Sequence, residues 1–520
     1  MARILVTEKL AESGLDLLRE AGHEVDVQIG LTPEEIHAVI PGAHALIIRS
    51  ATTVTAAMLD AGTDLVVVGR AGVGLDNVDV AAATERGVMV VNAPLSNVLS
   101  AAEQTLALIL ASARNTPQAH GALVQGRWER SNWTGMELGG KTLGIIGLGR
   151  IGSLVATRAR AFDMTLVGYD PFVSAERAEQ YGVRLVSLDE LAAISDVVTV
   201  HVARTPDTIG LIGSDFLSRA KPGIRVINVA RGGIVDEVAL MEALENGQAG
   251  GAGLDVFSSE PMTESPLFTH PKVVVTPHLG ASTHEAQDRA GLTIAEQVDL
   301  ALAGDFVPHA VNVDAGDVPG AVKPFLAVAE QVGALFAGLV EKLPERVVLT
   351  LEGEVGGYDD RLVSLAAAKG LLKTSGQVAS YVNARTILDD RGIQLNVVAK
   401  AQPRDYVSLL TITGGGRSIS ATLLGLRDEA RVVKLDDHDI DVPTAENMLV
   451  VRNDDRPGMI GVVGTILGEE GVNIDDMNVG RSDHNQSALM VIITKEPFSE
   501  SLGSRLRSQD GILDVDVVSV

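Results

Sequence analysis

Residues 142–152 read Thr-Leu-Gly-Ile-Ile-Gly-Leu-Gly-Arg-Ile-Gly. The first five residues have the apolar character of a short buried strand. Gly147, Gly149 and Gly152 follow at once, and a helical pattern continues over Ser153–Ala161. A strand, a Gly-x-Gly-x-x-Gly turn and a helix in this order bind dinucleotides in doubly wound α/β domains. The sequence therefore predicts a dinucleotide cofactor at this turn.

Each glycine of the turn has its own steric role. Gly147 permits the tight turn, Gly149 lets the backbone approach the pyrophosphate, and Gly152 lets the helix pack closely on the strand. Asp170 ends the next predicted strand, at about the spacing of the acid that binds the ribose hydroxyls. A carboxylate there repels the 2′-phosphate of NADP, so NAD is the predicted cofactor. The predicted cofactor turn comprises Gly147, Gly149, Arg150, Ile151 and Gly152.

The composition limits the class of protein. The 520 residues are 46% hydrophobic, with 54 glycines and 3% aromatic residues, which is typical of a multidomain chain of alternating helices and strands. The absence of cysteine excludes disulfides, thiolate catalysis and cysteine-ligated metals, and it agrees with a cytoplasmic location. No signal peptide, membrane span or metal site is expected.

The net charge of −26 argues against nucleic acid as a partner, because nucleic-acid-binding proteins present a basic surface. An anionic cofactor or substrate must then be bound locally. We expect arginines and backbone N–H groups to converge on one cleft.

Predicted strands and helices alternate on both sides of the glycine turn. A βα-rich block precedes the turn, a helix is predicted over Ser100–Leu123, and a second series of strands continues to about Val275. The predicted helix Thr283–Ala303 is long enough to return to the first block. We therefore predict a Rossmann-type, doubly wound cofactor domain (98–279) inserted into a discontinuous, flavodoxin-like substrate domain (1–97 and 280–310). Two crossings between these domains would form a hinge over a ligand cleft.

The remainder of the chain has a different pattern. Residues 311–445 predict an α+β intervening domain with three strands and one helix, Arg361–Leu371. Residues 446–520 alternate in the order strand, helix, strand, strand, helix, strand, which is typical of a ferredoxin-like fold. Gly414–Gly416, followed by Arg417 and Ser418, could form an anion site, although a hairpin loop explains these residues more simply.

Three residues suit the oxidation of a secondary alcohol. His278 follows the strand Val273–Thr276, and Arg231 follows another predicted strand, so both lie where open α/β sheets bind ligands. His278 could accept the hydroxyl proton and Arg231 could bind a carboxylate in two-point contact. Glu260 lies on a loop before Pro261, and as a partner of His278 it would fix the tautomer of the imidazole. Each residue alone has a structural explanation, and the prediction depends on the set.

The local sequences around these residues resemble the D-2-hydroxyacid dehydrogenases over residues 1 to about 310. They are Gly-Leu-Gly-Arg-Ile-Gly (147–152), Asn-Val-Ala-Arg-Gly-Gly-Ile-Val-Asp-Glu (228–237), Gly-Leu-Asp-Val-Phe-Ser-Ser-Glu-Pro (253–261) and Thr-Pro-His-Leu-Gly (276–280). The resemblance implies that Arg231 binds the substrate carboxylate and that Glu260 supports His278 as acid and base. Further residues that it places around NAD are His201, Thr205, Ala230, Asp255 and Gly280.

Upstream motifs resemble the phosphoglycerate dehydrogenase branch of this family. They are Ile-Ile-Arg-Ser-Ala-Thr-Thr-Val-Thr (47–55), Gly-Arg-Ala-Gly-Val-Gly-Leu-Asp-Asn-Val-Asp (69–79) and Val-Asn-Ala-Pro-Leu-Ser-Asn (91–97). The resemblance implies oxidation of 3-phospho-D-glycerate to 3-phosphohydroxypyruvate, the first step of L-serine synthesis. Arg49 and Arg70 would bind the phosphate, and Ser50, Val73, Gly74 and Asn97 would contact the rest of the substrate. Either arginine could instead form a surface ion pair.

Two alternative functions are compatible with the same fold. One is a dehydrogenase of glycerate, lactate or a bulkier D-2-hydroxyacid, which the paired Arg49 and Arg70 disfavour. The other is a dinucleotide-sensing protein without turnover, because a fold does not establish an activity.

The C-terminal sequence resembles an ACT domain, a module that binds small-molecule effectors. The resemblance is carried by Val-Arg-Asn-Asp-Asp-Arg-Pro-Gly-Met-Ile-Gly (451–461) and Gly-Val-Asn-Ile (471–474), and it implies an L-serine site at Asn453, Asp455 and Asn473. The chain departs from its relatives at Val-Arg-Asn, where they carry an aromatic residue or histidine. Pairing of cofactor domains through the helix Ser100–Leu123 implies a homo-oligomer, either a dimer or a tetramer.

Overall fold

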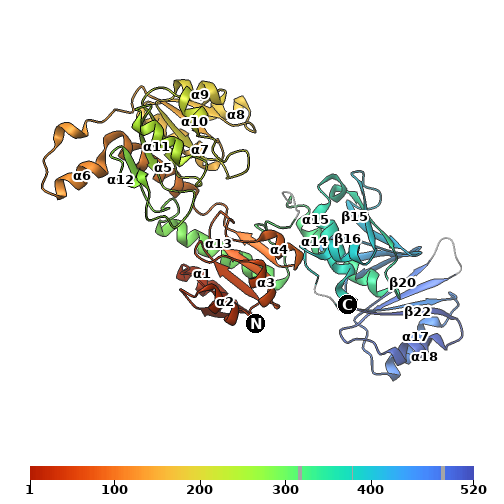
Figure 1. Cartoon of the computed structure of the whole chain (residues 1–520). Coiled ribbons are helices and arrows are strands. Elements are labelled where there is room, and N and C mark those ends of the chain that lie inside the picture. Colours follow the sequence, from red (N-terminus) through yellow and green to blue (C-terminus); the bar gives the residue numbers. More distant parts are fainter. Residues whose placement is uncertain (314–318, 377–378, 482–486) are drawn as a thin grey trace.

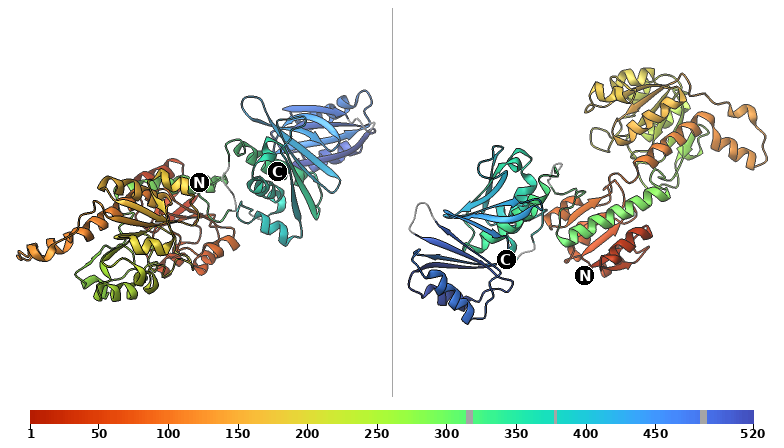
Figure 2. Two further views of the ribbon diagram at one scale, coloured as in Figure 1. Left: turned by 90° about the horizontal axis from the view of Figure 1, so that it is seen from above. Right: turned by 180° about the vertical axis from the view of Figure 1, so that it is seen from behind.

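The computed structural model describes residues 1–313, 319–376, 379–481 and 487–520. Four β-sheets follow one another along the chain, each with its own helices (Figure 1). The first two sheets lie in neighbouring lobes, and the last two lie together at the other end of the molecule (Figures 1 and 2). No helix of the described chain is long and apolar enough to span a membrane.

The first sheet is parallel in the order β2-β1-β3-β4-β5, the flavodoxin-like arrangement. α13 (His284–Ala303) returns to this sheet from beyond the second one: Ile294 and Val298 are buried in the same core as Ile4 and Val67. The other elements are β1 (Arg3–Val6), α1 (Glu12–Glu20), β2 (Glu24–Val27), α2 (Pro33–Val39), β3 (Ala45–Ile48), α3 (Ala56–Ala61), β4 (Val67–Arg70), α4 (Val80–Glu85) and β5 (Met89–Asn92).

The second sheet is parallel in the order β12-β11-β10-β9-β6-β7-β8, a Rossmann arrangement with one added strand. Its strands are β6 (Thr142–Ile146), β7 (Thr165–Tyr169), β8 (Arg184–Leu185), β9 (Val197–Val200), β10 (Ile224–Asn228), β11 (Ala249–Leu254) and β12 (Val273–Val275). Its helices include α7 (Arg150–Ala159), α8 (Ala175–Gln180), α9 (Leu188–Ile194), α10 (Ser214–Arg219), α11 (Glu237–Glu245) and α12 (Pro266–Thr269).

The single helix predicted over Ser100–Leu123 is wrong in one respect. The chain forms α5 (Val98–Arg114) and then α6 (Thr116–Val124), separated by Asn115 in a left-handed conformation with φ of 50°. Pro117 explains the break, because proline fits the first turn of a helix but not its interior. α5 packs on the sheet, whereas α6 projects away from it (Figure 1).

The third sheet has the order β14-β13-β15-β16-β17-β18, and only the pair β13–β14 is parallel. Its strands are β13 (Arg346–Gly353), β14 (Gln394–Lys400), β15 (Ser408–Gly414), β16 (Arg417–Leu424), β17 (Glu429–Leu435) and β18 (His438–Pro443). The prediction of one helix and three strands for this domain gave too few of both. α14 (Lys323–Gly338) and α16 (Ala384–Asp390) accompany α15 (Arg361–Leu371), and α14 is too uniformly apolar for its helical period to stand out.

The fourth sheet is antiparallel in the order β20-β21-β19-β22, and α17 (Met459–Glu469) and α18 (Glu500–Arg507) cover one face of it. This is the predicted ferredoxin-like arrangement. Its strands are β19 (Asn447–Asn453), β20 (Asp476–Arg481), β21 (Ala488–Ile493) and β22 (Ile512–Ser519).

Candidate functional site

His278 and Glu260 form a close polar pair at the ends of β12 and β11. His278 Nδ1 lies 2.6 Å from Glu260 Oε2, and the Phe257 N–H donates to Glu260 Oε1 at 2.9 Å. Partial burial alone would raise the pKa of Glu260, but these contacts outweigh it and hold the pKa below its ordinary value. Glu260 is therefore an ionised acceptor, which leaves Nε2 of His278 free to exchange a proton with a ligand.

Asp255 fixes the loop that carries His278. Its buried carboxylate accepts hydrogen bonds from Thr276 Oγ1 at 2.5 Å, from the Leu279 N–H at 2.7 Å and from the Gly280 N–H at 2.8 Å. The His278 backbone adopts a φ of 54°, and its N–H donates to the Asp255 carbonyl at 2.8 Å. Burial raises the pKa of Asp255 despite these donors. The four contacts set the position of the imidazole.

Arg231 lies on the loop after β10. The buried Asn228 braces this loop, because its side chain donates to the Arg231 carbonyl at 2.9 Å and accepts from the Ala230 N–H at 3.0 Å. The Arg231 guanidinium donates to the Ala230 carbonyl at 2.8 Å and lies 3.3 Å from Asp76 in the first lobe. Its positive charge also lowers the pKa of Glu260. Arg231 thus stands beside the His278–Glu260 pair and faces the other lobe.

Arg49 and Arg70 come from the ends of β3 and β4. The pKa of Arg70 is lowered first by burial and then by the positive charge of Arg231, with a smaller contribution from Arg49. Arg70 Nε is buried without a hydrogen-bond partner in the described chain. Arg70 is therefore close enough to Arg231 and Arg49 for both charges to act on it, and it retains an unused donor. An anion between them would relieve both conditions.

The other residues predicted to touch substrate lie in the first lobe and at the crossing to the second. Ser50 is exposed beside Arg49. The Val73 carbonyl is held by Asn92 Nδ2 at 2.7 Å, and a side chain at Gly74 would collide with the Arg231 guanidinium. Asn97 begins α5 at the crossing between lobes, and its Oδ1 is buried without a partner in the described residues. A small pocket is lined by Arg49 and Gly72 and, from the start of α13, by Ala286 and Gln287.

The glycine turn fits a dinucleotide at each of its three positions. Gly147 has φ of 91°, which L side chains rarely adopt. A Cβ at Gly152 would lie 2.0 Å from the Gly147 carbonyl oxygen, so the third glycine is required for helix packing. A Cβ at Gly149 would meet no atom of the described chain within 4 Å, so the space beside it can receive a pyrophosphate. Arg150 and Ile151 begin α7 with free backbone N–H groups.

Asp170, His201 and Thr205 border this turn. Both carboxylate oxygens of Asp170 accept backbone N–H groups, from Leu148 at 2.8 Å and Phe172 at 2.9 Å, which positions the carboxylate at the end of β7. His201 Nε2 lies 3.0 Å from Thr199 Oγ1, and burial lowers the pKa of His201 to about 4, so the ring is neutral at pH 7. Thr205 is exposed on the loop after β9.

Three family models match successive parts of the chain. They are the D-isomer specific 2-hydroxyacid dehydrogenase, NAD binding domain (residues 106–280), the D-3-phosphoglycerate dehydrogenase intervening domain (321–435) and the ACT domain (447–509). D-3-phosphoglycerate dehydrogenase of Mycobacterium leprae is 44% identical over 94% of each chain. That of Archaeoglobus fulgidus is 40% identical over the full length of both.

The chain belongs to the D-3-phosphoglycerate dehydrogenase family. It is an NAD-dependent dehydrogenase.

Solved structures resemble the first three-fifths of this family member. The TT0316 protein of Thermus thermophilus covers 59% of the chain with 37% identity and a TM-score of 0.56. The NAD-dependent formate dehydrogenase of Staphylococcus aureus, solved with NAD, covers 58% with 33% identity and a TM-score of 0.52. Nearly the whole of each neighbour is matched, at 99% and 96%, so both correspond to the two dehydrogenase lobes.

The residues predicted to hold an effector lie at one end of the ACT sheet. Asn453, at the end of β19, is buried, and its side chain accepts from the Asp455 N–H at 3.1 Å. Asn473 is exposed on the loop after α17.

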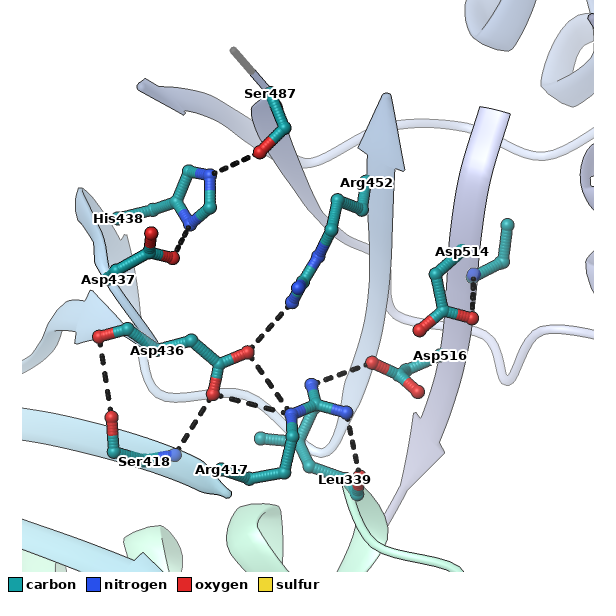
Figure 3. Close-up of polar contacts among 11 residues, drawn as sticks. Leu339, Arg417, Ser418, Asp436, Asp437, His438, Arg452, Ser487, Asp514 and Asp516 are labelled. Carbon is teal, nitrogen blue, oxygen red and sulfur yellow. Dashed lines mark hydrogen bonds and ion pairs between the residues drawn. The ribbon is translucent and has the colours of Figure 1, made fainter. Parts of the chain in front are cut away.

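Arg452 and Arg417 join the intervening and ACT domains (Figure 3). Arg452 lies 2.8 Å from Asp436, on the turn between β17 and β18. Arg417 contacts Asp436 at 3.1 Å and Asp516 of β22 at 2.8 Å. Gly414–Gly416 and Arg417 thus form the turn of the hairpin β15–β16. The Arg417 guanidinium is paired with the carboxylates of Asp436 and Asp516. Arg452 of the Val-Arg-Asn stretch therefore makes an interdomain contact.

Sequence reasoning missed three members of these sites: Asp76, Thr276 and Asp436. Thr276 lies two residues before His278, and a hydroxyl there could have been connected with Asp255. Asp76 and Asp436 have partners far away in the sequence, and only the folded chain brings them together.

Proposed function

We propose that this dehydrogenase oxidises 3-phospho-D-glycerate to 3-phosphohydroxypyruvate with NAD in the cytoplasm, the step that directs phosphoglycerate toward L-serine. One observation carries the proposal. The charges of Arg231 and Arg49 both act on Arg70, and the charge of Arg231 also acts on Glu260, the partner of His278. A substrate with a carboxylate at one end and a phosphate at the other needs such a divided set of cations, whereas lactate does not.

The reacting end of the substrate is bound by Arg231 and His278. Arg231 binds the carboxylate in two-point contact and polarises the oxygen on the neighbouring carbon. His278 Nε2 accepts the hydroxyl proton in oxidation and returns it in reduction, and the Glu260 carboxylate stabilises the resulting imidazolium through Nδ1. NAD, when bound, supplies the acceptor for the hydride.

The phosphate end is bound by the two arginines of the first lobe. The Glu8 carboxylate shapes their loop by accepting the Arg49 N–H at 2.8 Å and the Thr52 N–H at 2.9 Å. The buried Nε of Arg70 gives the phosphate a donor that the described chain leaves unpaired. Ser50, the backbone of Val73 and Gly74, and Asn97 complete the substrate contacts.

The cofactor site comprises the glycine turn and the residues around it. The N–H groups of Arg150 and Ile151 bind the pyrophosphate, and Asp170 accepts the adenosine ribose hydroxyls. His201 and Thr205 line the groove, while the Ala230 backbone, Asp255 and Gly280 lie next to the nicotinamide. A neutral His201 adds no charge to this groove.

We assign residues 1–97 with 280–310 to a substrate domain, 98–279 to an NAD domain, 311–445 to an intervening domain and 446–520 to an ACT domain. The chain is a homo-oligomer, because α6 and the residues after it expose large apolar side chains that a partner subunit would cover. Leu123, Val124 and Trp128 are 55–80% exposed. L-serine is the effector of the ACT domain, bound at Asn453, Asp455 and Asn473.

The test is reduction of phosphohydroxypyruvate, hydroxypyruvate and pyruvate by NADH, followed by absorbance, with and without L-serine. We expect a strong preference for the phosphorylated ketoacid and inhibition by serine. Arg231→Ala should abolish turnover on all three. Arg49→Gln should raise the KM for phosphohydroxypyruvate and leave hydroxypyruvate little affected. Arg19→Gln, on the surface of the same lobe, is the matched control.

Two results would contradict the proposal. Full turnover by the Arg231→Ala variant would exclude the mechanism. Equal effects of Arg49→Gln on phosphorylated and plain substrates would exclude the phosphate site, and the enzyme would then act on another D-2-hydroxyacid.

A further inference from the structure

The contact between Asp76 and Arg231 joins the two lobes. Asp76 lies on the loop between β4 and α4 of the first lobe, and Arg231 follows β10 of the second. Asp76 Oδ2 lies 3.3 Å from Arg231 Nε, and the side chains are 65% and 31% exposed. Both side chains are therefore accessible to a dissolved ligand.

The Asp76 loop is built to bring this carboxylate to the guanidinium. Asn77 Nδ2 donates to the carbonyls of Arg49 at 2.9 Å and Thr52 at 2.6 Å, which fastens the loop to the segment that carries Arg49. A Cβ added at Gly74 would lie 2.5 Å from Arg231 Nη2 and 2.9 Å from Asp76 Oδ2. Glycine at position 74 is what leaves room for the two charges to meet.

The electrostatics give Asp76 a second target. Its negative charge raises the pKa of Arg70, opposite to the effects of burial and of Arg231. Asp76 thus partly neutralises two of the three arginines to which we assign substrate binding. A carboxylate in this position resembles the substrate in charge and in chemistry.

We propose that Asp76 is a positioning residue that acts as the resident counter-ion of Arg231. In the substrate-free enzyme its carboxylate holds the guanidinium across the cleft, ready to receive a ligand. The carboxylate of the substrate takes its place on Arg231, and Asp76 withdraws toward solvent. This exchange rests on the proposed role of Arg231, and it makes apparent substrate affinity depend on a competing group of the protein itself.

The exchange predicts a separation of KM from kcat. An exposed ion pair is worth up to about 1 kcal/mol, so Asp76→Asn should lower the KM for phosphohydroxypyruvate by roughly two- to fivefold and change kcat less. Oxamate, a small carboxylate probe without phosphate, should inhibit this variant at correspondingly lower concentration. Asp76→Glu restores the carboxylate and should return both values toward those of the parent enzyme.

A matched control is available in the same lobe. Asp60 pairs with Arg86 at 2.7 Å, and those side chains are 65% and 27% exposed, close to the values for Asp76 and Arg231. Asp60→Asn removes the same charge from an equivalent ion pair outside the cleft, so its KM should equal that of the parent enzyme.

The outcomes separate this inference from the proposed function. An unchanged or higher KM in Asp76→Asn, together with loss of turnover in Arg231→Ala, would overturn the counter-ion role alone. A fall in kcat that exceeds the change in KM would show that Asp76 supports the reacting geometry of Arg231, which also overturns it. Full turnover in Arg231→Ala would remove the proposed function and this inference with it.

Discussion

Replacing Glu260 with glutamine tests how the His278 imidazole is held. Glutamine has nearly the same shape as glutamate. Its oxygen can still accept the hydrogen bond from the Phe257 N–H, which in the parent protein lies 2.9 Å from Glu260 Oε1. The other end of the side chain changes from an ionised acceptor to an NH₂ donor facing His278 Nδ1 across 2.6 Å. The imidazole must then turn or present an acceptor at Nδ1, which places the proton on Nε2, the wrong nitrogen for a base.

The magnitude follows from the kind of hydrogen bond that is lost. A hydrogen bond to a charged group contributes roughly 1.5–3 kcal/mol, and each 1.36 kcal/mol corresponds to a tenfold change in rate. His278 is 46% exposed and Glu260 32%, so solvent screening favours the lower half of that range. We expect kcat/KM to fall by about 13- to 45-fold, mainly through kcat.

The assay is NADH-dependent reduction of phosphohydroxypyruvate at pH 7.5, together with a thermal unfolding curve to verify the fold. Glu264→Gln, an exposed position in the same loop, is the control and should leave the rate unchanged. A loss of less than threefold in a folded Glu260→Gln enzyme would refute the role of the carboxylate. A loss that appears only in KM would refute the tautomer argument, because tautomer choice affects the chemical step.

Three further predictions concern the cofactor turn, a buried histidine and the interdomain network. Gly149→Ala should weaken NADH binding at unchanged stability, whereas Gly152→Ala, whose methyl group would lie 2.0 Å from the Gly147 oxygen, should cost roughly 1–3 kcal/mol of stability in denaturant titrations. The pKa of His201 is about 4 in the folded chain and 6.5 ordinarily, so the unfolded chain takes up the proton first as the pH falls. The free energy of unfolding should therefore fall by about 2 kcal/mol from pH 7 to pH 5. His201→Gln should remove this contribution to the pH dependence of stability. Arg417→Ala removes the cation that Asp436 and Asp516 share and should destabilise the C-terminal half by about 2–3 kcal/mol in chemical unfolding.

The sequence predicted best what depends on local chemistry. The strand over Thr142–Ile146 matches β6 residue for residue, and the three glycines after it have the steric surroundings that the motif predicts. The His278–Glu260 contact could also be anticipated, since each residue lies at or near the end of a strand in a parallel sheet. These features depend on short segments in which the hydrophobic pattern and the turn residues indicate the same structure.

Features that depend on tertiary packing could not be predicted. β11 has the sequence Ala-Gly-Gly-Ala-Gly-Leu, which has poor strand propensity, yet Gly253 is needed where α5 approaches the sheet: its Cβ would lie 3.0 Å from Leu108 Cβ. α14 is apolar over most of its surface because it packs on both a helix and a sheet. Asp76 has no distinguishing feature in the sequence, and only the fold brings it beside Arg231 of the second lobe.

The placement of the arginines resolves the conflict between an acidic chain and anionic ligands. The net charge of −26 is spread over a molecule much larger than the screening distance, which is about 8–10 Å at physiological salt, so a ligand in the cleft responds mainly to nearby groups. Arg49, Arg70 and Arg231 lie at the ends of three strands, and burial together with the charge of Arg231 lowers the pKa of Arg70. Asp76 offsets part of this repulsion while the cleft holds no substrate. The local charge is thus set by strand ends, which are fixed by the sheet, and the distribution of acidic residues elsewhere on the surface has little influence on binding.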